Sequence, residues 1–384
     1  MADYSIYIHL PFCESKCPYC DFHSVARANP PFAAYREALQ NEWRTNLLHH
    51  FGDGAPLSVY LGGGTPSIWP AEELLCLLDA LPTTTGEVTV EVNPGSLGPT
   101  WLRELRTGGV NRVSIGVQAL DDSRLRMLGR RHSAVDAHRA LLSSQEAGFS
   151  AISADIIYGT PGQIPAALET ELCKLLSARP HHVSAYELTY AEETPFGAAR
   201  RLGAMHPLDE SPLIALWRTT RDVLGSAGLE LYEISNYAIP GFESRHNRNY
   251  WLGGAYAGLG SGAHGFITDG SQAVRYANTP DIETYIAMWT GTTQRSDSEA
   301  FQSRKSECLT QFDLAKERMM LGLRTTKGVD LTDVLAMVPE PDQERWTVLA
   351  KRMAFRGLAH LRDGRLEPTE AGLLLGDAIA EEFF

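Results

Sequence analysis

The chain has 384 residues, of which 43% are hydrophobic and 21% are charged, and its formal net charge is −13. This length and composition are typical of a globular protein with one large domain and a smaller second one. The negative charge argues against a general nucleic-acid-binding surface, which needs a basic face. No apolar run reaches the ~18 residues of a transmembrane helix.

The first residues and the scattered cysteines both favour a cytoplasmic protein. The N-terminal segment has neither a basic region nor a long apolar stretch, so we expect no signal peptide and no Arg-rich transit peptide. Cys76, Cys173 and Cys308 stand alone in helical-looking segments and are expected to be buried structural thiols. Six cysteines in a chain of this length do not make a disulfide scaffold, which fits a reducing compartment.

Short β-branched apolar runs alternate with helical stretches through the first half of the chain. Strands are expected at 5–10, 57–63, 87–94, 112–118, 151–159 and 181–190, and helices at 31–50, 70–80, 100–109, 121–147 and 211–227. Apolar runs between helices indicate buried parallel strands. Nearly every predicted strand ends in polar or glycine-rich residues, as in a parallel barrel, whereas a doubly wound sheet has its site at one switch point. The sequence therefore predicts an α/β fold with a partial (β/α)6 TIM-like barrel.

The character of the sequence changes in the second half. A strand is expected at 230–238, and the segment that follows it to 266 is rich in Gly, aromatic residues and His without clear periodicity. Helical patterns return after about residue 280, and Asp363-Gly364 between two short runs is a hairpin signal. We therefore divide the chain into a barrel at 1–238, a Gly/aromatic loop region at 239–280 and a smaller helical, winged-helix-type domain at 281–384.

Three cysteines lie within eight residues, in the pattern C-x3-C-x2-C of Cys13, Cys17 and Cys20. Thiolates bind zinc, copper(I) and iron–sulfur clusters. A zinc site would need a fourth ligand, which His9 or His23 could supply. A redox pair of Cys17 and Cys20 would leave Cys13 unexplained. A cubane [4Fe–4S] cluster normally takes four thiolates, so three would leave one iron open to a ligand from outside the protein.

Polar groups at the other strand ends suit a ligand with an amino-acid end and a ribose. The glycines of "GGGTP" at 62–66 allow a ligand to approach the backbone closely, which suits an amino-acid end such as methionine. Glu91 ends a buried strand, where a carboxylate needs a partner such as a pair of ribose hydroxyls. Gln118 and Asp155 end two further strands and could act in the same cavity. The alternatives are a plain tight turn at 62–66 and structural roles for the polar side chains.

The stretches "YIHLPFCESKCPYCDF", "YLGGGTPS", "EVNP", "RVSIGVQ", "LGRRH", "DIIYGTPGQ" and "HNRNYW" resemble the radical SAM superfamily. More narrowly, they resemble the oxygen-independent coproporphyrinogen III oxidase-like family and its HemW-type haem chaperone branch. The likeness covers almost the whole chain. It implies a [4Fe–4S] cluster on the three cysteines, whose open iron binds the amino and carboxylate groups of S-adenosylmethionine (SAM).

The resemblance also implies which residues contact SAM, whereas it assigns no catalytic residue. Matched motif by motif, the SAM-binding residues are Tyr7, Tyr19, Gly63, Gly64, Thr65, Glu91, Gln118, Arg130 and Asp155.

Two departures separate the chain from the porphyrinogen-oxidising branch. That branch has a further cysteine two positions after the cluster motif, where this chain has Phe22, and an N-terminal extension, where only six residues precede Tyr7. Both favour a haem chaperone, which binds haem and delivers it to haem-requiring proteins. The alternative is an enzyme that decarboxylates porphyrinogen propionates, and enzymatic activity is left open.

The motif "HNRNYW" has the residue types that haem binding needs. His246 is the expected axial ligand. Tyr250 and Trp251 would pack on the macrocycle, and Arg245 and Arg248 would pair with its propionates. The resemblance agrees, because the family's motif is linked to haem binding.

The alternative is that His246 and Asn247 form a hydrogen-bonded loop packed on the barrel. His264 is a weaker second candidate for the haem ligand, whereas His9 and His132 are expected to be structural. The expected partners are haem and haem-accepting proteins, with peripheral membrane contact and a homodimer left open.

Overall fold

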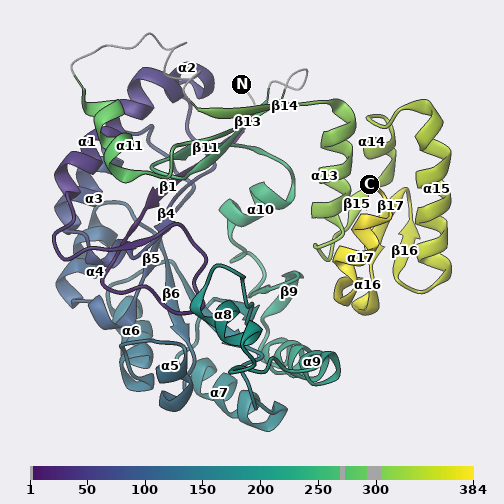
Figure 1. Ribbon diagram of the computed structural model, residues 1–384, viewed down its shortest axis with the longest axis horizontal. Coiled ribbons are helices and arrows are strands. Elements are labelled where there is room, and N and C mark those ends of the chain that lie inside the picture. The colour runs from purple at the N-terminus through teal and green to yellow at the C-terminus, as the bar shows by residue number, and fades with distance from the viewer. Residues whose placement is uncertain (1–2, 269–272, 292–303) are drawn as a thin grey trace.

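The computed structural model describes residues 3–268, 273–291 and 304–384. The chain forms a large α/β part and a smaller C-terminal part, which lie at the left and right of Figure 1. Across these residues, no helix has the length and apolar character needed to cross a membrane.

Six parallel strands form the centre of the α/β part, and the predicted fold class is confirmed. They hydrogen-bond in the order β1-β4-β5-β6-β7-β8, which is also their order along the chain. Their bounds are β1 (Tyr4–Leu10), β4 (Ser58–Gly63), β5 (Glu87–Val92), β6 (Arg112–Gln118), β7 (Ala151–Tyr158) and β8 (His182–Glu187). All six strands lie where the apolar runs predicted them.

Helices alternate with these strands and cover the outside of the sheet (Figure 1). They are α1 (Phe32–Glu42), α2 (Leu48–Phe51), α3 (Ala71–Leu78), α4 (Pro99–Thr107), α5 (Asp122–Met127), α6 (Ala134–Glu146), α7 (Pro165–Ser177), α8 (Pro195–Arg201) and α9 (Glu210–Ser226). A π-helical turn at Trp43–Leu47 joins α1 to α2, and short strands β2 (Phe12–Cys13) and β3 (Val25–Ala26) bracket the cysteine loop. Ile6, Ile8 and Val90, all fully buried, belong to the core between sheet and helices.

The three scattered cysteines are not buried as we predicted, because Cys76, Cys173 and Cys308 are exposed, and Cys308 lies in the strand β14 and not in a helix. On α3 the buried residues include Leu74 and Leu77, which face the sheet. Cys76 falls off this apolar stripe, since residues two apart on a helix point in different directions.

The strand predicted at 230–238 is wrong as a single element. The chain reverses there, and β9 (Glu230–Glu233) pairs antiparallel with β10 (Asn236–Ala238). The turn between them is held by the Ser235 N–H, which donates to the Glu233 carboxylate at 3.3 Å. β10 also pairs antiparallel with β8, so this hairpin ends the parallel run.

The predicted loop region at 239–280 contains regular structure and joins the main sheet. It forms α10 (Arg245–Trp251), β11 (Ala255–Leu259), β12 (His264–Thr268) and β13 (Ala273–Ala277). β11 pairs in parallel with β1, whereas β12, β13 and β14 (Lys305–Leu309) follow in antiparallel pairs. The backbones approach closely here, since a Cβ on Gly258 would lie 1.7 Å from the His264 carbonyl oxygen. The small residues that permit this approach also hide the strand periodicity in the sequence.

The C-terminal part has its own core and a three-stranded sheet in the order β15-β17-β16. Asp363 and Gly364 both have positive φ, 48° and 79°, as a two-residue hairpin turn requires, so the predicted hairpin is confirmed. Trp346 and Phe383 are fully buried in this core. Together with α11 (Ile282–Thr290) of the larger part, the remaining elements are α13 (Gln311–Gly322), β15 (Val329–Asp330), α14 (Leu331–Leu335), α15 (Glu340–Phe355), β16 (Ala359–Arg362), β17 (Arg365–Pro368), α16 (Glu370–Leu374) and α17 (Gly376–Glu381).

A fully buried carboxylate, Glu42, connects the N-terminal helix to the late strands. It accepts hydrogen bonds from the Gly260 N–H at 3.0 Å, the Asn278 side chain at 2.7 Å and the Tyr285 hydroxyl. It also pairs with the buried Arg304 guanidinium. Burial raises the pKa of Glu42, and these partners oppose that shift. The network holds α1 against the turn after β11, the end of β13 and α11.

We expect Glu42→Ala to destabilise the protein by about 3–5 kcal/mol, because it leaves the Arg304 guanidinium buried without its carboxylate. The measurement is the free energy of unfolding in urea. Glu283→Ala is the matched control, since Glu283 pairs with Arg27 at the surface, where side-chain exposures are 68% and 39%. It should cost less than about 1 kcal/mol. Equal losses in the two variants would contradict the anchoring role of Glu42.

Candidate functional site

Most of the predicted site residues line one cavity of about 500 Å³ inside the barrel and at the C-terminal ends of its strands. Those that line it are Cys13, Cys17, Tyr19, Cys20, Gly63, Gly64, Thr65, Glu91, Gln118, Arg130 and Asp155. Tyr7 and His246 lie elsewhere. The parallel topology explains the convergence, because the carboxyl ends of parallel strands meet at one mouth.

The cysteine loop is supported by polar groups that stabilise thiolates. The Thr65 hydroxyl donates to Cys13 Sγ at 3.4 Å, and Arg130 Nη1 donates to Cys17 Sγ at 3.5 Å. The Cys20 N–H donates to the Cys17 carbonyl at 3.1 Å and closes the loop. Burial raises the pKa values of the Cys13 and Cys20 thiols. Donors to sulfur offset this cost when a metal centre takes the thiolate form.

The geometry does not favour the zinc alternative, whereas the redox pair of Cys17 and Cys20 stays an alternative. Within the described ranges, no three His, Cys, Asp or Glu side chains are grouped closely enough for one metal ion. Both ring nitrogens of His9 are already bonded, to the Tyr7 hydroxyl at 2.9 Å and the His23 carbonyl at 2.7 Å. The cysteines, all in the described part, are free thiols. Free thiols on one loop suit a cluster, which places its thiolates on separate irons.

The glycine loop after β4 lies against the end of β1. A Cβ on Gly64 would lie 2.7 Å from the Leu10 carbonyl oxygen, and Gly63 has φ 106°. The Gly64 and Thr65 N–H groups donate to carbonyls of the preceding strands at 2.8 Å, and the Gly63 N–H donates to Glu91 at 3.0 Å. Only glycine permits this approach and this backbone conformation. These N–H groups already donate hydrogen bonds within the protein. The loop can therefore contact a ligand through its carbonyl groups.

Glu91 is a partly buried carboxylate at the wall of the cavity. Its Oε1 accepts from the Tyr60 hydroxyl at 2.8 Å, and its Oε2 accepts from Gly63 N–H. Burial raises the pKa of Glu91 to about 7, and the nearby Asp155 charge adds to the shift. Each oxygen keeps a further acceptor site for a ligand hydroxyl.

Asp155 and Arg130 are held by partners on neighbouring elements. Both oxygens of Asp155 accept from the Ser114 hydroxyl at 3.0 Å, and burial raises the Asp155 pKa to about 6. Arg130 Nη2 donates to the Asn93 side-chain oxygen at 3.0 Å. Gln118 ends β6 with φ 63°, a conformation that a non-glycine residue adopts rarely and most often at functional sites.

Sequence reasoning missed the residues that line the cavity deeper in the barrel. Inward positions alternate along each strand, which is the period of a β-strand. In "RVSIGVQ" the residues Arg112, Ser114, Gly116 and Gln118 line the cavity, and the valines and isoleucine between them are buried in the core. Polar residues at every second position were therefore the available signal. The other residues of the cavity wall that sequence reasoning missed are Tyr60, Thr89, Ser153, His182, Ser184 and Tyr186.

The structure places Tyr7 in a second cavity, of about 640 Å³, which Gly63 and Glu91 also line. Its hydroxyl is bonded to His9 Nδ1 at 2.9 Å. Phe22, Gly63 and Glu91 line both cavities, so the two adjoin. β1 directs the Tyr7 side chain toward the second cavity, and the SAM contact of Tyr7 stays a prediction.

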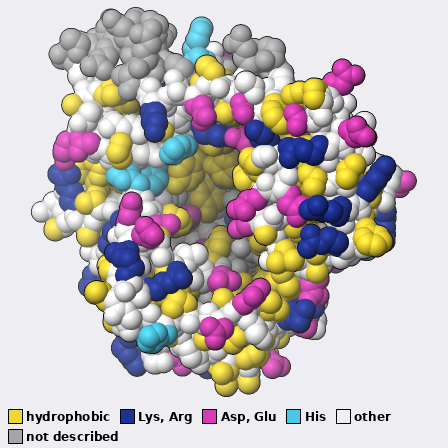
Figure 2. Space-filling model, turned by 45° about the vertical axis from the view of Figure 1, so that its right-hand side comes forward, with side chains coloured by type: hydrophobic (Ala, Val, Ile, Leu, Met, Phe, Trp, Pro, Cys, Tyr) yellow, Lys and Arg dark blue, Asp and Glu magenta, His cyan; other side chains and the backbone are white. Residues whose placement is uncertain are grey.

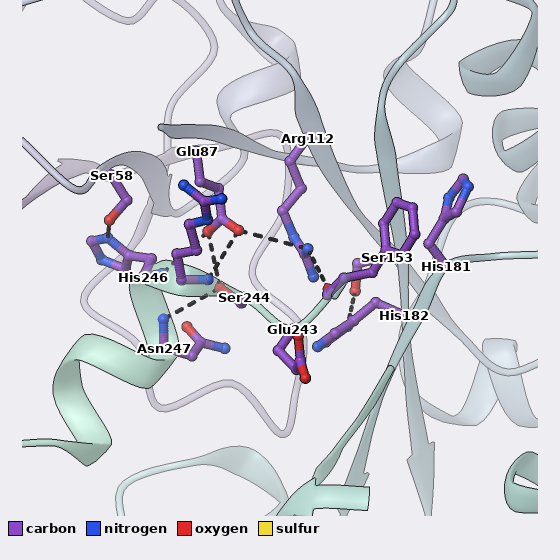
Figure 3. A network of polar contacts seen from close by, with 12 residues as sticks. Ser58, Glu87, Arg112, Ser153, His181, His182, Glu243, Ser244, His246 and Asn247 are labelled. Carbon is purple, nitrogen blue, oxygen red and sulfur yellow. Dashed lines mark hydrogen bonds and ion pairs between the residues drawn. The ribbon is translucent and has the colours of Figure 1, made fainter. Parts of the chain in front are cut away.

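His246 lies in the core, and its geometry favours the hydrogen-bonded loop over the predicted haem ligand. The residue is 1% exposed and lines neither cavity. Its Nδ1 is bonded to the Ser58 hydroxyl at 2.9 Å, as Figure 3 shows, and its Nε2 to the Tyr250 hydroxyl at 3.0 Å. Burial lowers the pKa of His246 to about 3. In this conformation neither ring nitrogen is available to iron.

A buried carboxylate fixes α10, which carries the HNRNYW motif, to the barrel (Figure 3). Glu87 accepts from the Ser244 hydroxyl at 3.1 Å, the Arg245 N–H at 3.0 Å and the His246 N–H at 3.2 Å. Arg112 lies 3.6 Å from the same carboxylate. An anion at the first N–H groups of a helix satisfies donors that have no partner within the helix. The motif therefore has a structural role, as in the alternative that the sequence left open, and Glu87 is the partner that the sequence did not indicate.

The other residues expected around haem are separated. Arg245, Arg248 and Trp251 line neither cavity, whereas Tyr250 and His264 line the second one. His132 Nε2 donates to the Val117 carbonyl at 3.1 Å, and the residue is buried, in agreement with its expected structural role.

Comparisons with known proteins agree with this architecture. Residues 7–171 match the radical SAM superfamily, and residues 309–375 match the HemN C-terminal domain. The heme chaperone HemW of Lactococcus lactis is 31% identical over 99% of this chain and 97% of the relative, and that of Bacillus subtilis is 32% identical over 99% and 98%. Coproporphyrinogen III oxidase (HemN) from Escherichia coli, a radical SAM enzyme, has the same fold, with a TM-score of 0.80 at 21% identity over 100% of this chain and 90% of that one. The chain thus belongs to the radical SAM superfamily and, within it, to the HemW-type family.

Proposed function

We propose that this protein binds haem and delivers it to haem-requiring proteins, and that it carries a [4Fe–4S] cluster and SAM. The observation that carries the proposal is the likeness, over nearly the full length, to two proteins named heme chaperone HemW. The proposed protein partners are the haem-requiring proteins that accept the haem.

Cys13, Cys17 and Cys20 would hold the cluster. Three free thiols on one loop leave one iron for SAM, and the donors from Thr65 and Arg130 favour the thiolate form. When bound, the cluster supplies an electron to the sulfonium of SAM.

The protein's own residues would bind and orient SAM. The carbonyl groups at 63–65 suit the methionine amino group, and Glu91 suits the ribose hydroxyls. Asp155, Gln118 and Arg130 add polar groups in the same cavity. The position of this cavity inside the barrel would limit the access of water to the sulfonium of bound SAM.

Phe22 supports the chaperone over the porphyrinogen-oxidising alternative. It occupies the position of that branch's further cysteine, and its side chain is 63% exposed between the two cavities. A phenyl ring cannot donate a proton as a thiol does or an electron pair as a thiolate does, whereas it can pack on a flat ligand.

The test of the proposed function is haem transfer by the anaerobically reconstituted full-length protein. Haem-loaded protein should pass haem to an apo-haemoprotein, as followed by the acceptor's absorption spectrum. Incubation with coproporphyrinogen III and SAM should give no decarboxylated product. Turnover of the porphyrinogen without haem transfer would replace the chaperone function with the enzymatic one.

We expect Cys13→Ala, Cys17→Ala and Cys20→Ala each to abolish the cluster, because three thiolates leave no spare protein ligand. The measurements are iron content and the visible absorption of the reconstituted protein. Cys76→Ala, at an exposed cysteine on α3, is the matched control and should keep the full iron content. A full cluster in any of the three loop variants would contradict the ligand assignment.

We expect SAM affinity to rise with pH through the Glu91 pKa of about 7. The ionised carboxylate is the better acceptor for ribose hydroxyls, and it is only about one-tenth populated one unit below its pKa. The dissociation constant for SAM should therefore fall by up to about tenfold between about pH 6 and pH 8. It is measured by equilibrium binding of SAM to reconstituted protein.

Glu91→Gln is the control for this pH dependence, because its amide does not titrate. The variant should bind SAM with a smaller pH dependence than the parent protein. The same pH profile in both proteins would show that Glu91 does not contact SAM.

A further inference from the structure

The second cavity lies beside the cluster cavity, between β1, the strands β11–β13 and the helix α13. Figure 2 shows a deep hollow between the two parts of the molecule, with hydrophobic side chains on its floor and histidine and charged side chains around its rim. We propose that this second cavity is the haem site and that His264 is the axial ligand of the haem iron. The inference rests on the proposed function and names the site that this function uses.

His264 is the histidine of this region whose ring is available to a metal. It lines the cavity as the first residue of β12, and its side chain is exposed. Its ring has no hydrogen bond or ion pair to any residue that the structure describes. His9 and His246, by contrast, have both ring nitrogens bonded inside the protein. A neutral imidazole with a free nitrogen is what haem iron requires of a proximal ligand.

His23, which also lines the cavity, is less suited to bind iron. Its Nε2 is bonded to the Ser261 hydroxyl at 3.4 Å, and its ring stacks on His9 at 5.6 Å between centroids. His264 has neither constraint.

The walls of the cavity fit a flat macrocycle. Tyr250 and Tyr256 line it with their rings 4.6 Å apart in an edge-to-face arrangement, and Phe266 lies 6.4 Å from Tyr256. Phe22 and Met320 add further apolar surface from the cluster loop and from α13. Aromatic and thioether side chains pack well on flat aromatic ligands. A volume of about 640 Å³ is within the usual range for a pocket that encloses an organic ligand of this size.

One arginine at this cavity has no carboxylate partner among the residues that the structure describes. Arg318 on α13 lines the cavity, is exposed, and forms no ion pair with another described residue. Arg275, the other arginine, donates to both oxygens of Glu317 at 2.8 and 2.7 Å, so its charge is already neutralised. In a chain with a net charge of −13, an unpaired guanidinium beside an apolar cavity points to an anionic ligand. Haem propionates provide such charge.

The backbone before His264 is held in place independently of any ligand. The Ala263 carbonyl accepts from the Asn278 N–H at 2.9 Å, and the Asn278 side chain is bonded to both Glu42 and the Gly260 carbonyl. The position of His264 is therefore set by the buried Glu42 network. A metal-binding side chain whose backbone is preorganised in this way loses little conformational entropy when the haem binds.

The experiment is a titration of the full-length protein with ferric haem, followed by absorption and by electron paramagnetic resonance. His264→Ala should weaken binding about tenfold or more and remove the spectrum of imidazole-ligated iron. Added free imidazole should restore that spectrum. His360→Ala, at an exposed histidine on β16 outside both cavities, should bind haem as the parent does.

Charge and the alternative ligand are tested in the same titration. Arg318→Glu should weaken binding about tenfold without a change in the iron spectrum, since it repels the propionates. Arg362→Glu, an exposed arginine outside both cavities, should have no effect. His246→Ala removes a partner of Tyr250, so it should weaken binding but keep the imidazole spectrum.

The outcomes separate this site from the proposed function. Haem binding with an unchanged spectrum in His264→Ala would overturn the site and leave the chaperone function standing. Loss of the imidazole spectrum in His246→Ala alone would show that His246 on α10 is the axial ligand. This result would also overturn the proposed site. Failure of the parent protein to bind haem would overturn the function and the site together.

Discussion

The arrangement of both cavities depends on carboxylates that are buried away from water. Glu42 joins α1 to the turn after β11, to β13 and to α11, so it adds a side-chain anchor to the backbone pairing of β11 with β1. Glu87 does the same for α10 by accepting from its first N–H groups. A buried carboxylate is costly unless every lone pair has a donor, which is why each of these has several. Loss of the donors to Glu42 or to Glu87 would therefore displace a helix or strand and not merely a side chain.

The two cavities share a wall, and this shared wall relates the cluster to the proposed haem site. Phe22, Gly63 and Glu91 face both spaces. The first cavity is lined by thiols and by carboxylates that include Glu91 and Asp155. The second has aromatic walls, an exposed histidine and an arginine that forms no ion pair with another described residue. A ligand in one cavity therefore contacts residues that also face the other. Such contact is the physical requirement for one ligand to influence the binding of the other.

The sequence predicted the fold and the first site closely, for reasons that are local. Six apolar runs became six parallel strands, and the residues at their ends met in one cavity, because topology brings strand ends together. The hairpin at Asp363 was equally readable from its turn residues. The sequence did not predict the strand β11, whose small residues are dictated by the backbone of β12, nor the division of 230–238 into two antiparallel strands.

By itself, the sequence determined which chemistry is present: three thiols for a cluster, a glycine loop, acidic strand ends and a phenylalanine in place of a fourth cysteine. Only the tertiary structure decided which histidine can reach a ligand. His246 belongs to a motif with the right residue types, but Ser58 and Tyr250 occupy both of its ring nitrogens. His264, the weaker candidate from the sequence, stands in a glycine-rich stretch and faces a cavity. The physical reason is that a histidine nitrogen can bind a ligand only if no distant segment supplies it with a hydrogen-bond partner. The spacing of residues along the chain does not indicate such partners.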